Sequence, residues 1–215
     1  MVAKINLEKS GGSSSGFDSK PLTEGVQEAR IVRVIDLGIQ ERKPFKGETK
    51  GPVGMVSVMF EMADDKVTIK DKDGKEETLP AFAFKTINVV GGERAALTKL
   101  SVAAGLGSNE LNFEDLLGKA VSLNIENREY NGKTYSNVKE ISGLSERVAK
   151  TVPELVADSY FFDFDAPDVE ILAKLGKGTK DKLRAALNFP GSKVEALLNK
   201  LDTEVKEEKP TKDII

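Results

Sequence analysis

The chain has 215 residues, of which 39% are hydrophobic and 31% charged, with a formal net charge of -3 and a pI near 5.4. It contains neither cysteine nor histidine, which excludes disulfides, the common zinc sites and the histidine-dependent hydrolase mechanisms. No apolar run is long enough to span a bilayer, and the first residues lack the apolar core of a secretory signal. We therefore expect a soluble globular protein without a metal or a cofactor.

The N-terminal part of the chain changes from a flexible pattern to a β pattern. Residues 1–20 include Lys9–Gly16, which is rich in glycine and serine and predicts a flexible tail. Branched and aromatic residues then predict three strands, over Val26–Leu37, Gly54–Glu61 and Ala81–Val90. Between the last two strands, Asp64–Lys66 predicts a turn, which a short charged hairpin follows.

A basic loop separates the first two predicted strands. Segment 39–52 combines proline, glycine and charged residues, a composition typical of loops. It carries one aromatic ring, Phe45, among four cations: Arg42, Lys43, Lys46 and Lys50. Such a loop suits nucleic acid, because rings stack on bases and cations contact phosphates. The alternative is that Phe45 packs onto the core and the cations are only solvated.

Segment 117–141 predicts a β-hairpin with its turn at Asn131 and Gly132. Asn-Gly is a strong hairpin signal, because both central residues of a type I′ turn need a positive φ. Val121, Leu123 and Ile125 alternate with polar residues, which predicts one buried face and one exposed face for the first strand.

Two tyrosines and two cations surround this turn: Arg128, Tyr130, Lys133 and Tyr135. The combination is typical of grooves that bind single-stranded nucleic acid. The alternative is that Tyr130 and Tyr135 form a cross-strand pair that only stabilises the hairpin. Arg33 and Lys85 are further candidates, and both lie in the middle of predicted strands.

The order of the predicted elements indicates the fold. A helix over Glu93–Ala104 follows the third strand, so the order is strand, basic loop, strand, charged hairpin, strand, helix and hairpin. This order is close to that of a five-stranded OB-type barrel with its helix between strands 3 and 4. We therefore expect a mainly β protein with helices (α+β).

After Gly143 the composition shifts toward short helices. Tyr160–Asp165 predicts an extended segment packed on the barrel, and Asp165 can cap the next helix. Another helix is predicted to begin at Thr179, and Ser192 with Glu195 forms a capping box for the last one. We expect a flexible tail at 1–20, an OB-fold domain at 21–145, a helical appendage packed on the barrel at 146–201 and a flexible tail at 202–215.

Several short patterns resemble a known family. They are Asp36-Leu-Gly38, Leu117-Gly-Lys-x-Val121 and Tyr130-Asn-Gly-Lys-x-Tyr135-x-Asn-Val138, with Phe162-Asp-Phe-Asp165, Leu175 and Asn188-Phe189 in the C-terminal part. Over roughly residues 22–200, the chain resembles the OB-fold single-stranded-DNA-binding proteins of tailed bacteriophages.

The resemblance implies a protein that binds and protects single-stranded DNA with little sequence preference, during phage DNA replication or recombination. It implies the bacterial host cytoplasm as location, and replication or recombination proteins as partners of the C-terminal tail. It implies no membrane and no enzymatic activity, and an oligomer is compatible with it. The expected DNA-binding residues are those of the basic loop and the hairpin: Arg42, Lys43, Phe45, Lys46, Lys50, Arg128, Tyr130, Lys133 and Tyr135.

Two other functions are compatible with such a fold, because a fold does not determine function. The first is a protein-interaction module that acts through its C-terminal helices, whose binding would respond little to salt. The second is a metal-dependent nuclease that uses carboxylates alone, such as Asp64 with Asp65, or Asp163 with Asp165. Turns and helix caps explain these carboxylates equally well.

Overall fold

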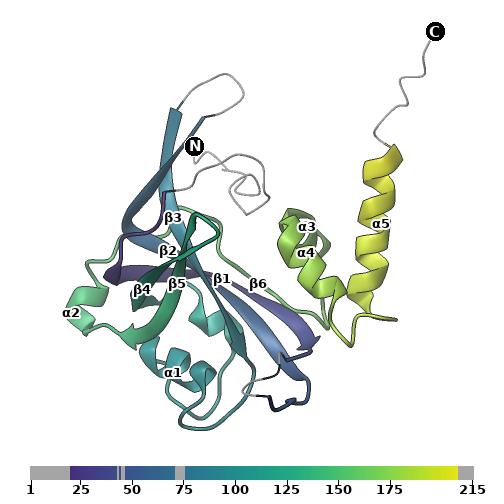
Figure 1. Cartoon of the computed structure of the whole chain (residues 1–215), viewed down its shortest axis with the longest axis horizontal. Helices are drawn as coiled ribbons and strands as arrows, with labels where there is room; N and C mark the ends of the chain where they lie inside the picture. The colour runs from purple at the N-terminus through teal and green to yellow at the C-terminus, as the bar shows by residue number, and fades with distance from the viewer. Residues whose placement is uncertain (1–19, 43, 45–46, 71–75, 208–215) are drawn as a thin grey trace.

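A single sheet with β1 at its centre forms the body of the molecule (Figure 1). The computed structural model describes residues 20–42, 44, 47–70 and 76–207, and over these residues the chain is mainly β with short helices, as expected. The elements are β1 (Gly25–Gln40), β2 (Val53–Lys70), β3 (Glu76–Asn88), α1 (Ala96–Ala103), the 3-10 helix η2 (Phe113–Leu116), β4 (Ala120–Tyr130), β5 (Lys133–Gly143), α2 (Glu146–Ala149), β6 (Tyr160–Phe162), α3 (Val169–Lys174), α4 (Lys177–Arg184) and α5 (Lys193–Glu207).

The strand order in the sheet is β3-β2-β1-β4-β5, and all of these neighbours are antiparallel. The short strand β6 pairs with β1 in parallel, with Phe161 beside Val34. Helix α1 lies between β3 and β4 in the chain, where the helix was predicted. β2 continues through Asp64–Lys66, so the turn predicted there is wrong, and a register shift between Glu61 and Lys66 takes its place.

The closed five-stranded barrel that the element order predicted is not confirmed. The described chain forms six strands, and no backbone ladder joins the outer strands β3 and β5. The two strands nevertheless lie side by side, because the Lys85 ammonium on β3 donates hydrogen bonds to the carbonyls of Val138 (2.5 Å) and Lys139 (3.2 Å) on β5.

The first hydrophobic core lies on the inner face of the sheet. The alternation predicted for β4 is confirmed, since Val121, Leu123 and Ile125 are all buried there. Phe60 on β2 and Leu100 on α1 belong to the same core. Since successive residues of a strand point to opposite faces, Ser122, Asn124 and Glu126, which alternate with these buried residues, point outward.

The second hydrophobic core joins the end of β1 to the C-terminal helices. Ile35 and Leu37 of β1 pack with Phe162, Leu172 and Leu183. Figure 1 shows α3, α4 and α5 standing together beside the sheet, away from α1 and α2. Helix α5 continues through Glu207, beyond the predicted start of the C-terminal tail at residue 202. The predicted domain boundaries stay predictions.

Candidate nucleic-acid interface

The β4–β5 hairpin turns at Asn131 and Gly132, as predicted. Their φ angles are 52° and 70°, so both central residues of the turn have the positive φ that a type I′ turn needs. β4 and β5 continue to the edges of this turn, at Tyr130 and Lys133. The Asn-Gly pair therefore fixes the register of both strands through local backbone chemistry.

That register places the four candidate side chains of the hairpin on one face. Arg128 pairs with Tyr135, and Tyr130 pairs with Lys133. Paired residues of an antiparallel ladder share a face, and so do residues two apart on one strand. The two tyrosines are therefore diagonal neighbours and are not directly opposite each other.

A partly buried polar network shows which face this is. Asn127 Nδ2 donates to the Leu22 carbonyl (2.9 Å), Ser136 Oγ donates to Asn127 Oδ1 (2.7 Å), and the Leu22 amide donates to Ser136 Oγ (2.9 Å). Asn127 and Ser136 thus face the segment that precedes β1. The neighbouring residues Arg128 and Tyr135 face outward, on the opposite side of the hairpin.

Both tyrosine rings of the hairpin are accessible. Tyr130 is 69% exposed and Tyr135 is 49% exposed. Within the described residues the only ring–ring contact is between Phe113 and Phe161, so the two tyrosines do not stack on each other. This arrangement does not support the alternative of a stabilising tyrosine pair.

The charges on this face are partly paired. Arg128 binds Glu126 through Nε (3.1 Å) and Nη2 (2.8 Å), and Lys139 lies 4.0 Å from the same carboxylate. Lys133 is exposed, and its ammonium has no ion-pair or hydrogen-bond partner among the residues that the structure describes. Arg128 and Lys139 therefore share the Glu126 carboxylate, whereas Lys133 does not, so the cations among these four side chains outnumber the carboxylate.

Phe84 on β3 adds a third ring, which the sequence analysis did not identify. It is 56% exposed and pairs with Met59 of β2. Its neighbour Ala83 is buried in the first core, so Phe84 points to the outer face. The alternation of alanine and phenylalanine over 81–84 carried the signal that could have located it. Because Lys85 holds β3 beside β5 at Val138 and Lys139, this outward-facing ring lies next to the middle of β5.

We call this outer region around the β3–β5 junction the seam surface. It consists of Phe84, Arg128, Tyr130, Lys133, Tyr135 and Lys139.

The basic loop lies at the opposite end of β1 from the hairpin. Gly25 at the start of β1 pairs with Ile125, whereas the loop follows Gln40 at the end of β1. Arg42 closes part of the loop, because its Nε donates to the Gly51 carbonyl (2.6 Å). Lys50 is exposed. The other loop candidates, Lys43, Phe45 and Lys46, lie outside the described residues, so their roles stay predictions.

A segment after α2 covers the outer face of β1 between these two regions. Arg30 donates to the carbonyls of Val152 (2.9 Å) and Pro153 (2.7 Å). The buried Glu61 carboxylate accepts hydrogen bonds from the amides of Val156 (2.8 Å) and Ala157 (2.9 Å). The accessible outer surface of the sheet is therefore displaced from β1 toward β3 and β5.

The two mid-strand candidates have structural roles. Arg33 donates to the Asp158 carbonyl (3.2 Å), and its guanidinium lies 4.7 Å from the centre of the Tyr160 ring. Lys85 joins β3 to β5, and burial lowers the pKa of its ammonium. We therefore include neither residue in the interface.

The carboxyl group of Asp36, on β1 beside the second core, has a raised pKa. Burial raises the pKa of its carboxyl above the ordinary 3.8, and the nearby carboxylates of Asp163 and Asp165 raise it further. The Gly38 amide donates to the Asp36 carboxylate (2.9 Å), which acts in the opposite direction. Asp163 itself accepts the Asp165 amide (2.8 Å) in a local turn.

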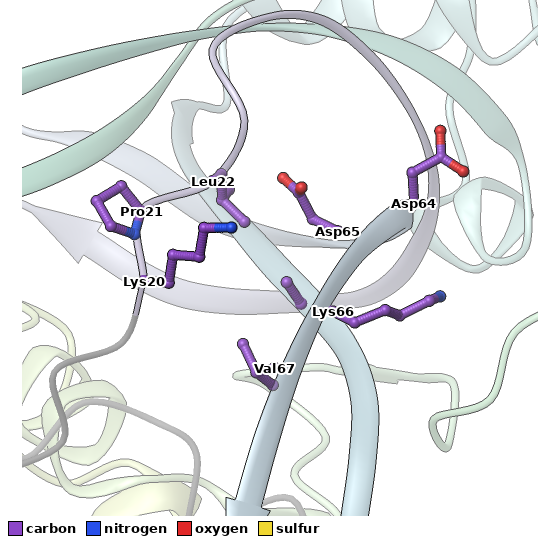
Figure 2. A pocket seen from close by; sticks show the side chains of 8 residues that line it. Lys20, Pro21, Leu22, Asp64, Asp65, Lys66 and Val67 are labelled. Atoms are coloured by element: carbon purple, nitrogen blue, oxygen red, sulfur yellow. The ribbon is translucent and has the colours of Figure 1, made fainter.

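A small hollow lies between the segment before β1 and the irregular middle of β2 (Figure 2). Its volume is about 190 Å³, and it is lined by Lys20–Leu22, Asp64–Val67 and Ala81. Asp65 accepts hydrogen bonds from the amide (2.7 Å) and hydroxyl (2.6 Å) of Thr23, and Figure 2 shows Asp64 pointing another way. The hollow is smaller than a typical small-molecule pocket of about 300–1,000 Å³.

The described residues contain no group of three or more carboxylates that could hold a metal ion. No helix in the described parts of the chain has the length and apolar character needed to cross a membrane. The fold and the seam surface thus define a mainly β protein with an aromatic and basic outer face. No protein-family model and no curated protein matches the chain.

Proposed function

We propose that this protein binds single-stranded DNA without strong sequence preference, and that the seam surface is its principal contact. The observation that carries the proposal is the grouping of three exposed rings with three cations on one outer face. Every base has a face that can stack on a ring, whereas cations contact phosphates regardless of sequence. The surface therefore suits a flexible strand with exposed bases.

The sheet order adds support. In an OB-type fold, strand 1 lies between strands 2 and 4, and the helix lies between strands 3 and 4. β1, β2, β4 and α1 have these relations. An open barrel of this type, with Lys85 across its junction, is the architecture that we propose. The loop after strand 1 and the loop between strands 4 and 5 are the ligand loops of such folds.

The motif resemblance to phage proteins suggests the context. We propose protection of single strands during phage DNA replication or recombination, in the host cytoplasm, without enzymatic activity. Recruitment of replication or recombination proteins would use the C-terminal tail, and residues 208–215 of that tail lie outside the described residues.

A binding titration tests the proposal. A labelled oligo-dT of about 30 nucleotides, long enough for one or more OB-fold footprints, is titrated with the full chain at several salt concentrations. Each phosphate contact to a single strand contributes roughly -0.7 to the slope of log affinity against log salt, so about four contacts predict a slope near -3. Absence of binding at low salt would overturn the proposal. Binding to a protein with little salt dependence would instead favour an interaction module.

A further inference from the structure

Helices α3 and α4, which a short turn joins, carry positive charge that the seam surface does not use. Between Ile171 and Leu187 the sequence has five cations and one acid, Asp181. Three of these cations are the exposed residues Lys174, Lys177 and Lys182. Their ammonium groups have no hydrogen-bond or ion-pair partner among the described residues. We call these three lysines the basic turn.

The other two cations of the segment have structural partners. Lys180 donates to the Ala173 carbonyl (2.9 Å), which ties α4 to the end of α3. Arg184 binds Asp202 on α5 (2.8 Å) and Asp181 (3.4 Å). The one acid of the segment is therefore already paired with Arg184, and the basic turn has no ion-pair partner among the described residues.

Helix α4 is fixed at the point where β1 passes into the basic loop. Gln40 Nε2 donates to the Lys182 carbonyl (3.0 Å), and the Leu187 amide donates to the Ile39 carbonyl (2.7 Å). Asn188 Oδ1 accepts the Ile39 amide (2.8 Å). Leu183 of α4 is fully buried in the second core. Helix α4 is therefore held both by this core and by its hydrogen bond from Gln40 at the end of β1.

This docking makes the basic turn continuous with the first loop. Gln40 is two residues before Arg42, so the hydrogen bond to Lys182 brings α4 next to the root of that loop. The large apolar side chains exposed at this junction, Ile39 and Leu187, are aliphatic and not aromatic. Among the described residues, the junction therefore offers charge for phosphates and no exposed aromatic ring for bases.

We propose that the basic turn is a second contact surface for single-stranded DNA, which binds the phosphate backbone of the strand as it passes the first loop. This inference rests on the proposed function and extends it. A strand long enough to reach both surfaces would contact bases at the seam surface and only phosphates at α3 and α4. The basic turn thus adds affinity and salt dependence for long strands, and no affinity for short ones.

The test compares two triple variants with the wild type. The first replaces the basic turn (Lys174→Gln, Lys177→Gln, Lys182→Gln), and the matched control replaces three exposed cations elsewhere (Arg94→Gln, Lys99→Gln, Lys119→Gln). Both remove three positive charges, so any effect of net charge is equal. Each protein is titrated with oligo-dT of about 8 and about 30 nucleotides, which lie within and beyond a single OB-fold site of roughly 4–16 nucleotides.

The basic-turn variant is expected to bind the short oligonucleotide like the control. On the long one its salt slope should be shallower by about 2, from three contacts at roughly 0.7 each, with affinity at low salt on the order of a hundredfold weaker. Equal slopes and affinities for the two variants on the long strand, with the wild type binding both strands, would overturn the inference alone. A wild type that binds neither oligonucleotide would overturn the proposed function and the inference together.

Discussion

The most informative change to the seam surface removes the rings of both hairpin tyrosines together. Tyr130 is 69% exposed and Tyr135 is 49% exposed, so the double variant Tyr130→Ala, Tyr135→Ala deletes accessible stacking area with little loss of packing. One stacked base is worth roughly 1–3 kcal/mol by alanine substitution. Two rings at the low end give about 2 kcal/mol, which corresponds to roughly 30-fold weaker binding.

The assay is fluorescence anisotropy with labelled oligo-dT at one fixed salt concentration. The matched control is Tyr130→Phe, Tyr135→Phe, which keeps both rings and removes only the hydroxyls. It should bind within a few-fold of the wild type. Thermal unfolding should be similar for all three proteins, because exposed substitutions usually change stability by less than about 0.5 kcal/mol. Equal affinity of the alanine and phenylalanine variants would refute stacking on the hairpin.

Three further changes test other parts of the account. Phe84→Ala should weaken oligo-dT binding by about 1 kcal/mol or more, because it removes the ring. Phe84→Tyr keeps the ring and should bind like the wild type. Equal binding affinities of the two variants would remove Phe84 from the interface. Lys85→Met leaves the carbonyls of Val138 and Lys139 without their donor, so the free energy of unfolding in urea should fall by about 1–3 kcal/mol. An unchanged unfolding midpoint would contradict a stabilising role of these two hydrogen bonds. The raised pKa of Asp36 means that the folded chain holds this proton more tightly than the unfolded chain, so its contribution to stability is present below pH 3.8 and is lost as the pH rises through the folded-state pKa. Asp36→Asn should therefore gain stability relative to the wild type as the pH rises above 3.8 in urea unfolding, and a constant difference would contradict this reasoning.

Local signals in the sequence predicted local structure well. Asn131 and Gly132 fixed the hairpin turn. Half of the predicted capping box is present: Ser192 Oγ accepts the Glu195 amide (3.1 Å), whereas the Glu195 carboxylate accepts the Gly191 amide (2.6 Å) instead of the Ser192 amide. Each of these features depends on residues within a few positions of one another, so tertiary context has little power to change them.

The sequence was less reliable where several neighbouring residues could each cap a helix. The helix predicted to be capped by Asp165 is capped by Asp168, which accepts the Glu170 and Ile171 amides. The helix predicted to begin at Thr179 has Gly176 as its N-cap. Several nearby residues could serve as caps in both segments, and packing of Leu172 and Leu183 into the second core selects between them.

Features that depend on distant pairing could not be read from the sequence. The roles of Phe84 and Lys85 follow from the approach of β3 to β5, which are separated by more than forty residues. The irregular pairing of β2 between Glu61 and Lys66 follows from its long ladder with β3, which overrides the polar Asp64–Lys66 signal. Composition also gave no sign that Glu61 would hold the segment at Val156.

The central claim is that bases stack on the hairpin, and tyrosine fluorescence tests it most directly. The chain has three tyrosines and no tryptophan, so tyrosine emission can be observed, and the third tyrosine, Tyr160, lies against Arg33 away from the hairpin. Oligo-dT binding should quench most of this emission in the wild type. The variant Tyr130→Phe, Tyr135→Phe should still bind by anisotropy and lose the quenching. Full binding of DNA with unchanged wild-type tyrosine emission would contradict the account.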